Sequence, residues 1–218
     1  PIPRKDVFMP RSRSARVASS RSIALIGPAT PPPPTLSKDD INALPIQAYE
    51  GDIRLIRDEE ALTDALKHLE REDVLGFDTE TRPIFTKGKT SSPALLQLAA
   101  RDCVYLVQLT RQPFDERLAA LLANSRIIKA GVAVRDDLLA LKRLHPFVPG
   151  GAVDLAALAR ARGIKAQGLR SLAASLLGFR ISKSAQCSNW ERDELSPQQI
   201  RYAATDAWVG RELYARLA

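Results

Sequence analysis

The sequence predicts an α/β fold, in which a mixed β-sheet is flanked by helices and preceded by an extended N-terminal arm. Two apolar segments, residues 94–99 and 103–109, are separated by a short turn and predict a β-hairpin. After this hairpin, strand-length apolar runs alternate with segments of helical periodicity. Hairpin strands followed by alternating strands and helices are typical of a mixed sheet with helices around it.

The spacing of apolar residues predicts each strand and helix. Apolar runs of strand length occupy residues 52–56, 74–77, 94–99, 103–109 and 127–134. Helical spacing occupies residues 58–70, 115–123, 137–144, 154–162 and 169–177. The last helix is the best marked, because Ser196 suits its N-cap, Pro197 its first position and Gln199 a capping box. We expect it to end near residue 217.

The chain has few residues for disulfides or for a zinc site. Its two cysteines, Cys103 and Cys187, are far apart, and its two histidines, His68 and His145, are isolated in the sequence. Neither a disulfide framework nor a Cys/His zinc site is expected, and a reducing, cytoplasmic location fits. Any functional metal would be held by carboxylates, which suit Mg²⁺ or Mn²⁺. The longest apolar stretches are too short to span a membrane.

Residues 1–45 differ in composition from the rest of the chain. They contain nine of the fifteen prolines, and their seven Lys/Arg against three Asp/Glu give +4 of the total charge of +7. Such a segment lacks the apolar residues for a core, so we expect a flexible leader before a domain at residues 46–218. Two interpretations stay open, a flexible basic arm and an organelle transit peptide. Because the leader carries most of the charge, basicity alone does not establish nucleic-acid binding.

Asp78 and Glu80 follow the apolar run at residues 74–77. Side chains two residues apart on a strand point to the same face, so these carboxylates are expected to project together. Adjacent carboxylates repel each other unless a positive charge lies between them, and a divalent cation supplies that charge. The alternative is a strand end that turns into a polar loop. The position on a buried strand before a basic loop favours the metal interpretation.

A second acidic pair, Asp136 and Asp137, stands where a strand gives way to a helix. Either residue suits an N-cap. Helical phase aligns Asp137 with Leu141 on the apolar stripe, whereas Asp136 falls on the solvent side. A carboxylate on a buried stripe needs a partner. Asp137 is therefore the predicted metal ligand and Asp136 the predicted cap.

Tyr202 and Asp206 are four residues apart in the last helix and therefore share a face. A surface Tyr–Asp pair is the alternative interpretation. The small residues Ala203, Ala204 and Ala207 indicate instead that this helix packs closely against a neighbour. Together the three segments bring four carboxylates and a phenol to one predicted pocket.

Taken in order, these segments resemble the three motifs of the DEDD exonucleases, in the subclass that contains a tyrosine. The matching segments are residues 77–80 with Asp78 and Glu80, Asp137 six residues after Gly131, and Tyr202 with Asp206. The resemblance covers roughly residues 52–217 and extends to the exonuclease domain of the Werner-syndrome helicase and, more distantly, to ribonuclease D. It implies a ribonuclease H-like five-stranded mixed sheet and the release of 5′-mononucleotides from a free 3′ end of DNA or RNA.

The resemblance also implies a two-metal-ion mechanism with two divalent cations, Mg²⁺ or Mn²⁺. Asp78 is expected to contact both ions, Glu80 and Asp206 to complete the site that activates water, and Asp137 to help hold the second ion. Tyr202 is expected to orient the attacking water as a neutral phenol. The alternative function is a catalytically inactive exonuclease fold that serves as a nucleic-acid-binding module.

Substrate contacts are expected beside these carboxylates. The sequence does not distinguish DNA from RNA or single strands from duplexes, and it leaves the oligomeric state open. Basic side chains near the site suit backbone phosphates, and an aromatic ring suits stacking on a base. For the tryptophan, packing beneath the last helix is the alternative. The candidates are Arg82, Lys87, Lys89, Lys183, Trp190 and Arg192.

Overall fold

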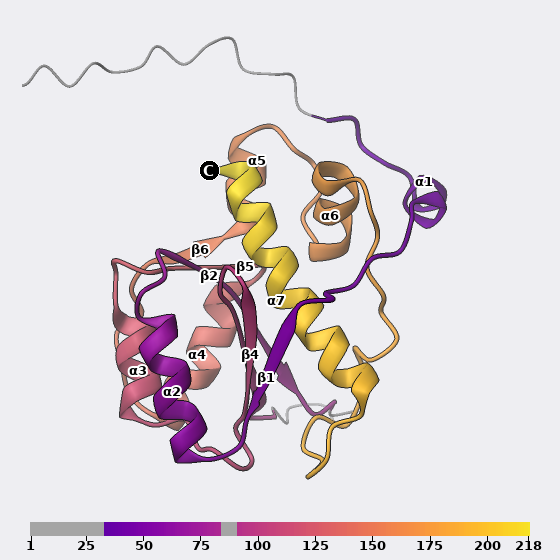
Figure 1. The fold of residues 1–218 in the computed structure, drawn as a ribbon. Helices are drawn as coiled ribbons and strands as arrows, with labels where there is room; N and C mark the ends of the chain where they lie inside the picture. Colours follow the sequence, from indigo (N-terminus) through magenta and orange to yellow (C-terminus); the bar gives the residue numbers. More distant parts are fainter. Residues whose placement is uncertain (1–32, 84–90) are drawn as a thin grey trace, which may run out of the picture. The chain divides into compact units, whose positions relative to one another are not determined.

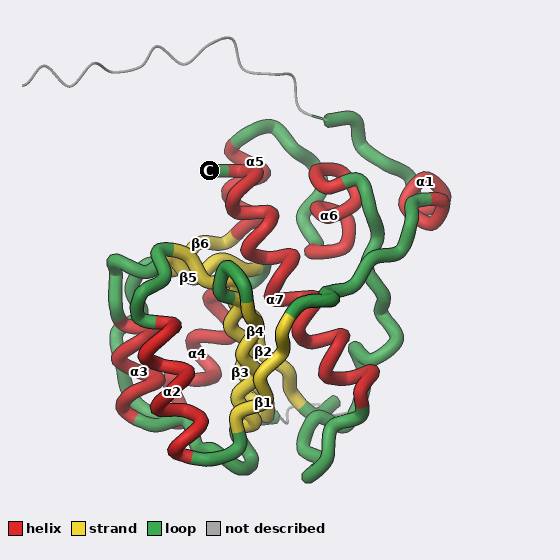
Figure 2. Tube along the Cα trace, viewed as in Figure 1, coloured by secondary structure: helices red, strands yellow, loops and turns green. Residues whose placement is uncertain are grey.

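A six-stranded mixed sheet forms the centre of the computed structural model, which describes residues 33–83 and 91–218 (Figure 1, Figure 2). The strand order is β1-β4-β3-β2-β5-β6. Strand β3 runs antiparallel to both β2 and β4, whereas the pairs β1–β4, β2–β5 and β5–β6 are parallel. The strands are β1 (Asp52–Ile56), β2 (Val74–Thr81), β3 (Pro93–Ala99), β4 (Cys103–Gln108), β5 (Ile128–Gly131) and β6 (Ala152–Asp154).

The predicted mixed sheet with flanking helices is confirmed, but the expectation of five strands is wrong. The sixth strand is β6, which pairs with β5 from Lys129 with Ala152 to Gly131 with Asp154. β6 has only three residues and leads directly into a helix. So short a segment has no alternation to distinguish it from the helix that follows, and its pairing with β5 makes it a strand.

Seven helices accompany the sheet in the described part of the chain. Helices α2, α3 and α4 cover one face, and α7 crosses the other face with α5 and α6 beside it (Figure 1). None of the described helices combines the length and apolarity needed to cross a membrane. The helices are α1 (Lys38–Ala43), α2 (Glu59–Leu69), α3 (Glu116–Ala123), α4 (Val134–Leu144), α5 (Leu155–Ala161), α6 (Leu169–Leu177) and α7 (Pro197–Leu217).

Helix α7 lies directly on the middle of the sheet, because small residues allow the approach. A methyl group at Gly76 of β2 would overlap the carbonyl of Ala207 in α7. A Cβ at Gly210 would lie 2.9 Å from the carbonyl oxygen of Ala130 in β5, a less severe approach. The close packing predicted for this helix is confirmed, and its first partner is β2. The predicted capping box is also confirmed, with Ser196 Oγ accepting from the amide of Gln199 at 3.2 Å.

The predicted leader, residues 1–45, is described from residue 33 onward. Its end contains the exposed helix α1, so regular structure begins before residue 46. After α1, residues 45–47 form backbone hydrogen bonds with the segment that follows α6. The amide of Arg180 donates to the carbonyl of Pro45, and the amide of Gln47 donates to the carbonyl of Arg180, both at 2.9 Å. The domain boundary at residue 45 stays a prediction.

Candidate active site

Asp78 and Glu80 lie side by side on β2, on the sheet face that α7 covers. The strand continues to Thr81 rather than ending at residue 77, so both carboxylates are part of the strand itself. They share a face with Gly76, which contacts α7. The pairing with β3 shifts register between Glu80 and Thr81, at the end of the strand. The predicted projection of both carboxylates to one side is confirmed.

Asp137 reaches the same strand from the first turn of α4. It is half-buried, and its Oδ1 accepts a hydrogen bond from Thr79 Oγ1 at 2.5 Å. Asp136 is exposed to solvent. The choice of Asp137 as the residue that faces the sheet therefore agrees with the structure.

The predicted capping role of Asp136 is wrong, because α4 begins three residues earlier than expected. Its N-cap is Ala133, which has a left-handed backbone (φ 60°) and no side chain that can cap. The amide of Ala133 donates to Asp154 Oδ2 at 2.9 Å, while Asp154 Oδ1 caps α5. The carboxylate of Asp154, from β6, therefore stabilises the start of α4 in place of a capping side chain within the helix.

Asp206 and Tyr202 come from α7 and meet the strand carboxylates at one cavity. Asp206 is only 7% exposed, and Tyr202 is half-buried. A cavity of about 360 Å³ is lined by Asp78, Glu80, Tyr202 and Asp206 together. Asp137 is not among the lining residues, although its charge acts on Asp78.

Burial raises the pKa of every one of these carboxyl groups, and repulsion by the other site carboxylates raises the pKa of Asp78 and Glu80 further. For Asp78 burial is the largest cause, followed by the charges of Asp206 and Asp137, and its pKa lies well above the ordinary value. Burial raises the pKa of Glu80 to about 9, with Asp78 as the next cause. Burial likewise raises the pKa of Asp206 to about 7 and that of Asp137 to about 6. The metal-free site therefore holds protons near neutral pH.

Tyr202 stays a neutral phenol in this environment. Burial raises the pKa of its hydroxyl, and the charges of Asp206 and Glu80 raise it further. The ring lies 6.0 Å from that of Trp190, centre to centre, which fixes it against the core. The hydroxyl can therefore donate a hydrogen bond but is poorly suited to act as a base.

The four carboxylates have no basic partner in the described part of the chain. None of the ion pairs there involves Asp78, Glu80, Asp137 or Asp206. Opposite Asp78 on β3, the side chain of Gln97 is fully buried and both its amide atoms lack a hydrogen-bond partner. Burying anionic groups without a counter-charge costs free energy. Protons or bound cations would remove that cost at this site.

The candidate substrate contacts have different positions. Lys183 lines the carboxylate cavity. Arg82 is exposed and pairs with Glu191 at 3.3 Å. Arg192 is exposed and is not among the residues that line the cavity. Lys87 and Lys89 lie outside the described residues.

The prediction that Trp190 stacks on a base is wrong. Its side chain is 0% exposed and belongs to the apolar cluster under α7, so its ring faces are not accessible. The alternative interpretation, packing beneath the last helix, is the correct one. A large apolar ring directly before a helix N-terminus is the signal that favours this position.

The N-terminal end of α6 also belongs to the cavity, although the sequence did not predict it there. Gly168, Leu169 and Arg170 line the carboxylate cavity opposite β2 and α7. The guanidinium of Arg170 donates to Asn42 Oδ1 at 2.8 Å. A basic side chain in the first turn of a helix opposes the helix dipole, and this was the available signal for an anion at this position.

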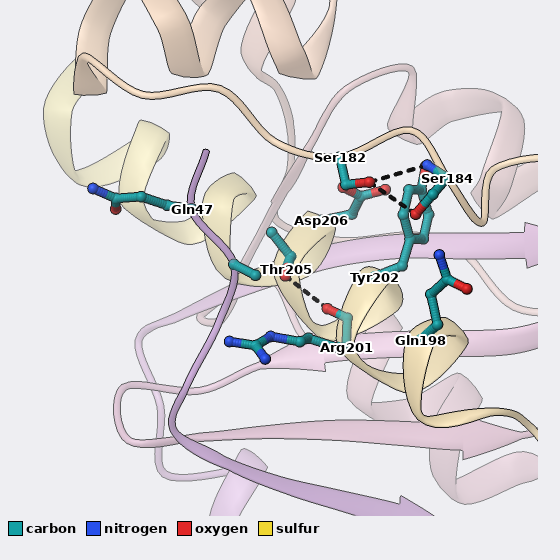
Figure 3. Close-up of a pocket in the computed structure, with 9 residues that line it drawn as sticks. Gln47, Ser182, Ser184, Gln198, Arg201, Tyr202, Thr205 and Asp206 are labelled. Atoms are coloured by element: carbon teal, nitrogen blue, oxygen red, sulfur yellow. Dashed lines mark hydrogen bonds between the residues drawn. The ribbon is translucent and has the colours of Figure 1, made fainter. Parts of the chain in front are cut away.

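A smaller cavity lies along the first turns of α7. It measures about 200 Å³ and includes Tyr202 and Asp206 in its wall (Figure 3). Ser182 and Ser184, which are bonded to each other at 2.8 Å, contribute hydroxyl groups to it. Polar groups that donate and accept hydrogen bonds thus continue from the acidic cavity along α7.

Comparisons with known proteins agree with this geometry. A family model described as 3′-5′ exonuclease matches residues 53–218. The chain is 35% identical over 151 residues to the mouse bifunctional 3′-5′ exonuclease/ATP-dependent helicase WRN, covering 66% of this chain and 11% of that protein. It is 34% identical over 162 residues to the Drosophila melanogaster exonuclease 3′-5′ domain-containing protein 2, covering 72% of this chain and 27% of that protein. The chain therefore spans about a quarter or less of these relatives.

A solved structure supports the fold assignment independently. The Aedes aegypti Nibbler EXO domain superposes with a TM-score of 0.71 at 24% identity, covering 78% of this chain and 90% of that one. At this level of identity the likeness concerns the fold. It agrees with a ribonuclease H-like arrangement of the mixed sheet and its helices.

Proposed function

Because the chain belongs to the 3′-5′ exonuclease family, we propose that it is an active, metal-dependent 3′-5′ exonuclease. It hydrolyses phosphodiester bonds of DNA, RNA or both, and it releases 5′-mononucleotides from a free 3′ end. One observation carries the proposal. Four carboxylates with raised pKa values meet beside one cavity and, within the described residues, have no basic partner.

The donor set fits hard divalent cations. All four groups are carboxylates, and Mg²⁺ and Mn²⁺ prefer oxygen ligands. No three of the four bring their oxygens within 4.8 Å of one another, whereas oxygens around one Mg²⁺ lie roughly 3 Å apart. Side-chain rotation of Asp78, Glu80 and Asp206 toward the cavity would therefore accompany metal binding. The loss of their mutual repulsion favours that movement.

In the proposed mechanism each carboxylate has a distinct place. Asp78, on which the charges of both Asp206 and Asp137 act, would help to hold both cations. Glu80 and Asp206 would complete the site that activates water, and Asp137 would help to hold the second cation. Bound divalent ions supply charge neutralisation at the phosphate and lower the pKa of the attacking water. Tyr202 donates a hydrogen bond and so orients that water. Thr79, which donates to Asp137, holds that carboxylate in position.

The opposite wall of the cavity suits the phosphates of the strand. Arg170 and Lys183 bring positive charge, and the N-terminus of α6 adds the positive end of its dipole. Phosphate contacts of this kind position a strand without reading its bases. This agrees with an enzyme that removes nucleotides one after another irrespective of sequence.

The test is a degradation assay on 5′-labelled single-stranded DNA, recessed duplex DNA and RNA, with Mg²⁺, Mn²⁺ or EDTA. We expect a ladder of products shortened from the 3′ end with either metal, release of 5′-mononucleotides, and no products in EDTA. Binding without cleavage of any substrate would instead support the inactive nucleic-acid-binding module.

The adjacent aspartates of α4 provide a matched pair of variants. Asp137→Asn removes a carboxylate that contacts β2, and we expect kcat to fall by about 10²-fold or more, in line with losses of groups that act in the transition state. Asp136→Asn changes an exposed neighbour, and we expect activity within about twofold of the wild type. Equal activities of the two variants would overturn the assignment of Asp137. Circular dichroism checks that both variants fold.

A further inference from the structure

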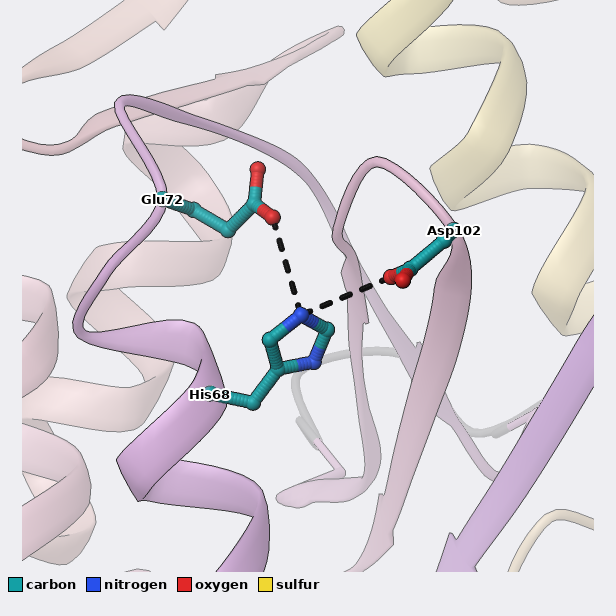
Figure 4. Close-up of side chains that lie close together, drawn as sticks. All are labelled: His68, Glu72 and Asp102. Carbon is teal, nitrogen blue, oxygen red and sulfur yellow. Dashed lines mark ion pairs between the residues drawn. The ribbon is translucent and has the colours of Figure 1, made fainter.

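A second group of metal-ligating side chains lies away from the carboxylate cavity. His68 at the end of α2, Glu72 shortly after it and Asp102 in the turn between β3 and β4 point toward one another (Figure 4). In the part of the chain that the structure describes, only these three ligand atoms among His, Cys, Asp and Glu groups all lie within 4.8 Å of one another. Glu72 lies just before the first residue of β2, Val74, whereas Asp78 and Glu80 lie in the second half of that strand.

The spacing of the three groups is close to that around a bound zinc ion. His68 Nε2 lies 3.4 Å from Asp102 Oδ1 and 3.8 Å from Glu72 Oε1. With ligand bonds of ~2.0–2.1 Å in a tetrahedral site, ligand atoms are roughly 3.3–3.5 Å apart. The distance from His68 to Asp102 already falls in this range, the distance from His68 to Glu72 is slightly longer, and all three ligand atoms lie within 4.8 Å of one another.

The second nitrogen of His68 is held in the manner of a metal-binding histidine. Nδ1 lies 2.6 Å from the hydroxyl oxygen of Tyr105, whose ring is buried. When Nε2 binds a cation, Nδ1 carries the ring proton and its N–H donates a hydrogen bond to this oxygen. Such outer hydrogen bonds orient the imidazole rings of metal sites.

Glu72 also has an outer partner, while Asp102 faces solvent. The other oxygen of Glu72, Oε2, lies 3.7 Å from Arg211 Nη2 of α7, and the two side chains are 12% and 17% exposed. Asp102 is 74% exposed. Two ligands are therefore held by packed neighbours, and the third leaves an open side through which a cation can enter.

We propose that His68, Glu72 and Asp102 form a zinc-binding site that joins the end of α2 to the β3–β4 turn. The imidazole nitrogen favours Zn²⁺ over Mg²⁺, which prefers oxygen ligands and retains its water. Solvent water completes the tetrahedron on the open side. The competing arrangement is a protonated His68 paired with the two carboxylates, without metal. The site is independent of the proposed exonuclease activity.

The test counts zinc bound to the full chain. Protein freed of metal by a chelator is dialysed against ZnCl₂ in excess Mg²⁺, which occupies the carboxylate cavity, and bound zinc is measured by atomic emission. We expect the wild type to bind one more equivalent of zinc than His68→Gln. His145→Gln, which changes the other histidine, is the matched control and keeps this equivalent. Equal zinc in the wild type and His68→Gln would overturn the proposal in favour of the protonated ion pair.

A second variant separates metal binding from any fault in folding. Asp102→Asn changes an exposed turn residue, so its metal-free thermal unfolding should match that of the wild type. Zinc should raise the Tm of the wild type and of His145→Gln but not of Asp102→Asn. Tyr105→Phe keeps the ring and should weaken zinc binding ~10–100-fold. A zinc-induced rise in Tm in Asp102→Asn equal to that of the wild type would contradict the site. Mg²⁺-dependent nuclease activity should be unchanged in Asp102→Asn.

Discussion

At the scale of single residues, the carboxylates of the candidate active site link protonation to stability. Burial raises the pKa of Asp206 to about 7. Between its ordinary value near ~4 and about 7, the folded protein keeps a proton that the unfolded chain has released. This contribution to stability is therefore complete below about pH 4 and is lost as the pH rises through about 7.

Asp206→Asn tests this linkage. In EDTA we expect the free energy of unfolding of the wild type to fall between about pH 5 and about pH 8, because protons leave the buried carboxylates. The variant has one titrating group fewer, so its free energy should fall less over the same range. Urea unfolding at each pH measures both slopes. If the slopes coincide, the carboxyl of Asp206 does not titrate in this range.

Lys129 is a second residue whose environment defines its role. Its side chain is 0% exposed, and Nζ donates to the carbonyls of Asn124 and Ile127, both at 2.7 Å. These carbonyls follow the end of α3. Lys129→Met would remove the side-chain donor from the buried carbonyl of Ile127 and leave the carbonyl of Asn124 with only the amide of Ile127, so we expect the free energy of unfolding to fall by about 1–3 kcal/mol. The exposed Lys142→Met serves as the control and should change stability by no more than about 0.5 kcal/mol. Chemical denaturation measures both.

Residue roles were predictable where local geometry decides them. The alternation of side chains along a strand placed Asp78 and Glu80 on one face, and helical phase separated Asp137 from Asp136. The failures came from packing between distant segments. Trp190 is buried because α7 covers it, and Asp136 is not a cap because Asp154 supports the turn at Ala133.

At the scale of secondary-structure elements, the contact between α7 and β2 sets the distance between Asp206 and Asp78. Gly76 permits this contact, because a Cβ there would overlap the backbone of Ala207. Gly178 provides a contrast. It has a left-handed backbone (φ +75°), but nothing lies within 4 Å of the place of its Cβ.

Two Gly→Ala variants separate these effects. Gly76→Ala forces α7 away from β2, so we expect a loss of about 2 kcal/mol or more in stability, as for overpacked cores, together with a marked loss of kcat. Gly178→Ala introduces only backbone strain, so we expect a loss of about 1–2 kcal/mol and an unchanged kcat. Thermal unfolding and the degradation assay measure the two properties. Full activity in Gly76→Ala would contradict the role of this contact in positioning Asp206.

The spacing of apolar residues predicts most of the strands and helices, because the pattern that identifies each one lies within a few residues of sequence. The strand at residues 52–56 and the helix at residues 169–177 have the predicted bounds. β2 is longer than predicted because its polar end pairs with β3, and β6 exists because β5 offers it a partner. Pairing with a distant strand leaves little trace in the local sequence.

At the scale of the whole molecule, positive charge is distributed unevenly along the chain. Residues 1–32 contain six Lys/Arg against one Asp, a balance of +5 out of +7. The compact unit of the structure begins at Pro32.

A chain that begins at residue 33 tests the contribution of this charge to substrate binding. We expect its kcat on a short substrate at saturation to match that of the full chain. Its affinity should depend less on salt, with the slope of log Kd against log salt reduced by up to ~3–5, since fewer phosphate contacts release fewer counterions. Fluorescence anisotropy over a salt series measures the slope. An unchanged slope would show that residues 1–32 do not take part in binding.

The sequence by itself determined the α/β class, the order of most elements and the carboxylates that the candidate active site contains, because alternation and helical phase act over a few residues. Only the tertiary structure decided which distant groups meet. Packing of α7 on β2 brings Asp206 beside Asp78, and the end of α6 brings Arg170 opposite them. The β3–β4 turn brings Asp102 to His68, which is isolated from other metal-ligating histidines and cysteines in the sequence. Such encounters depend on close packing between elements, a property of the folded chain as a whole.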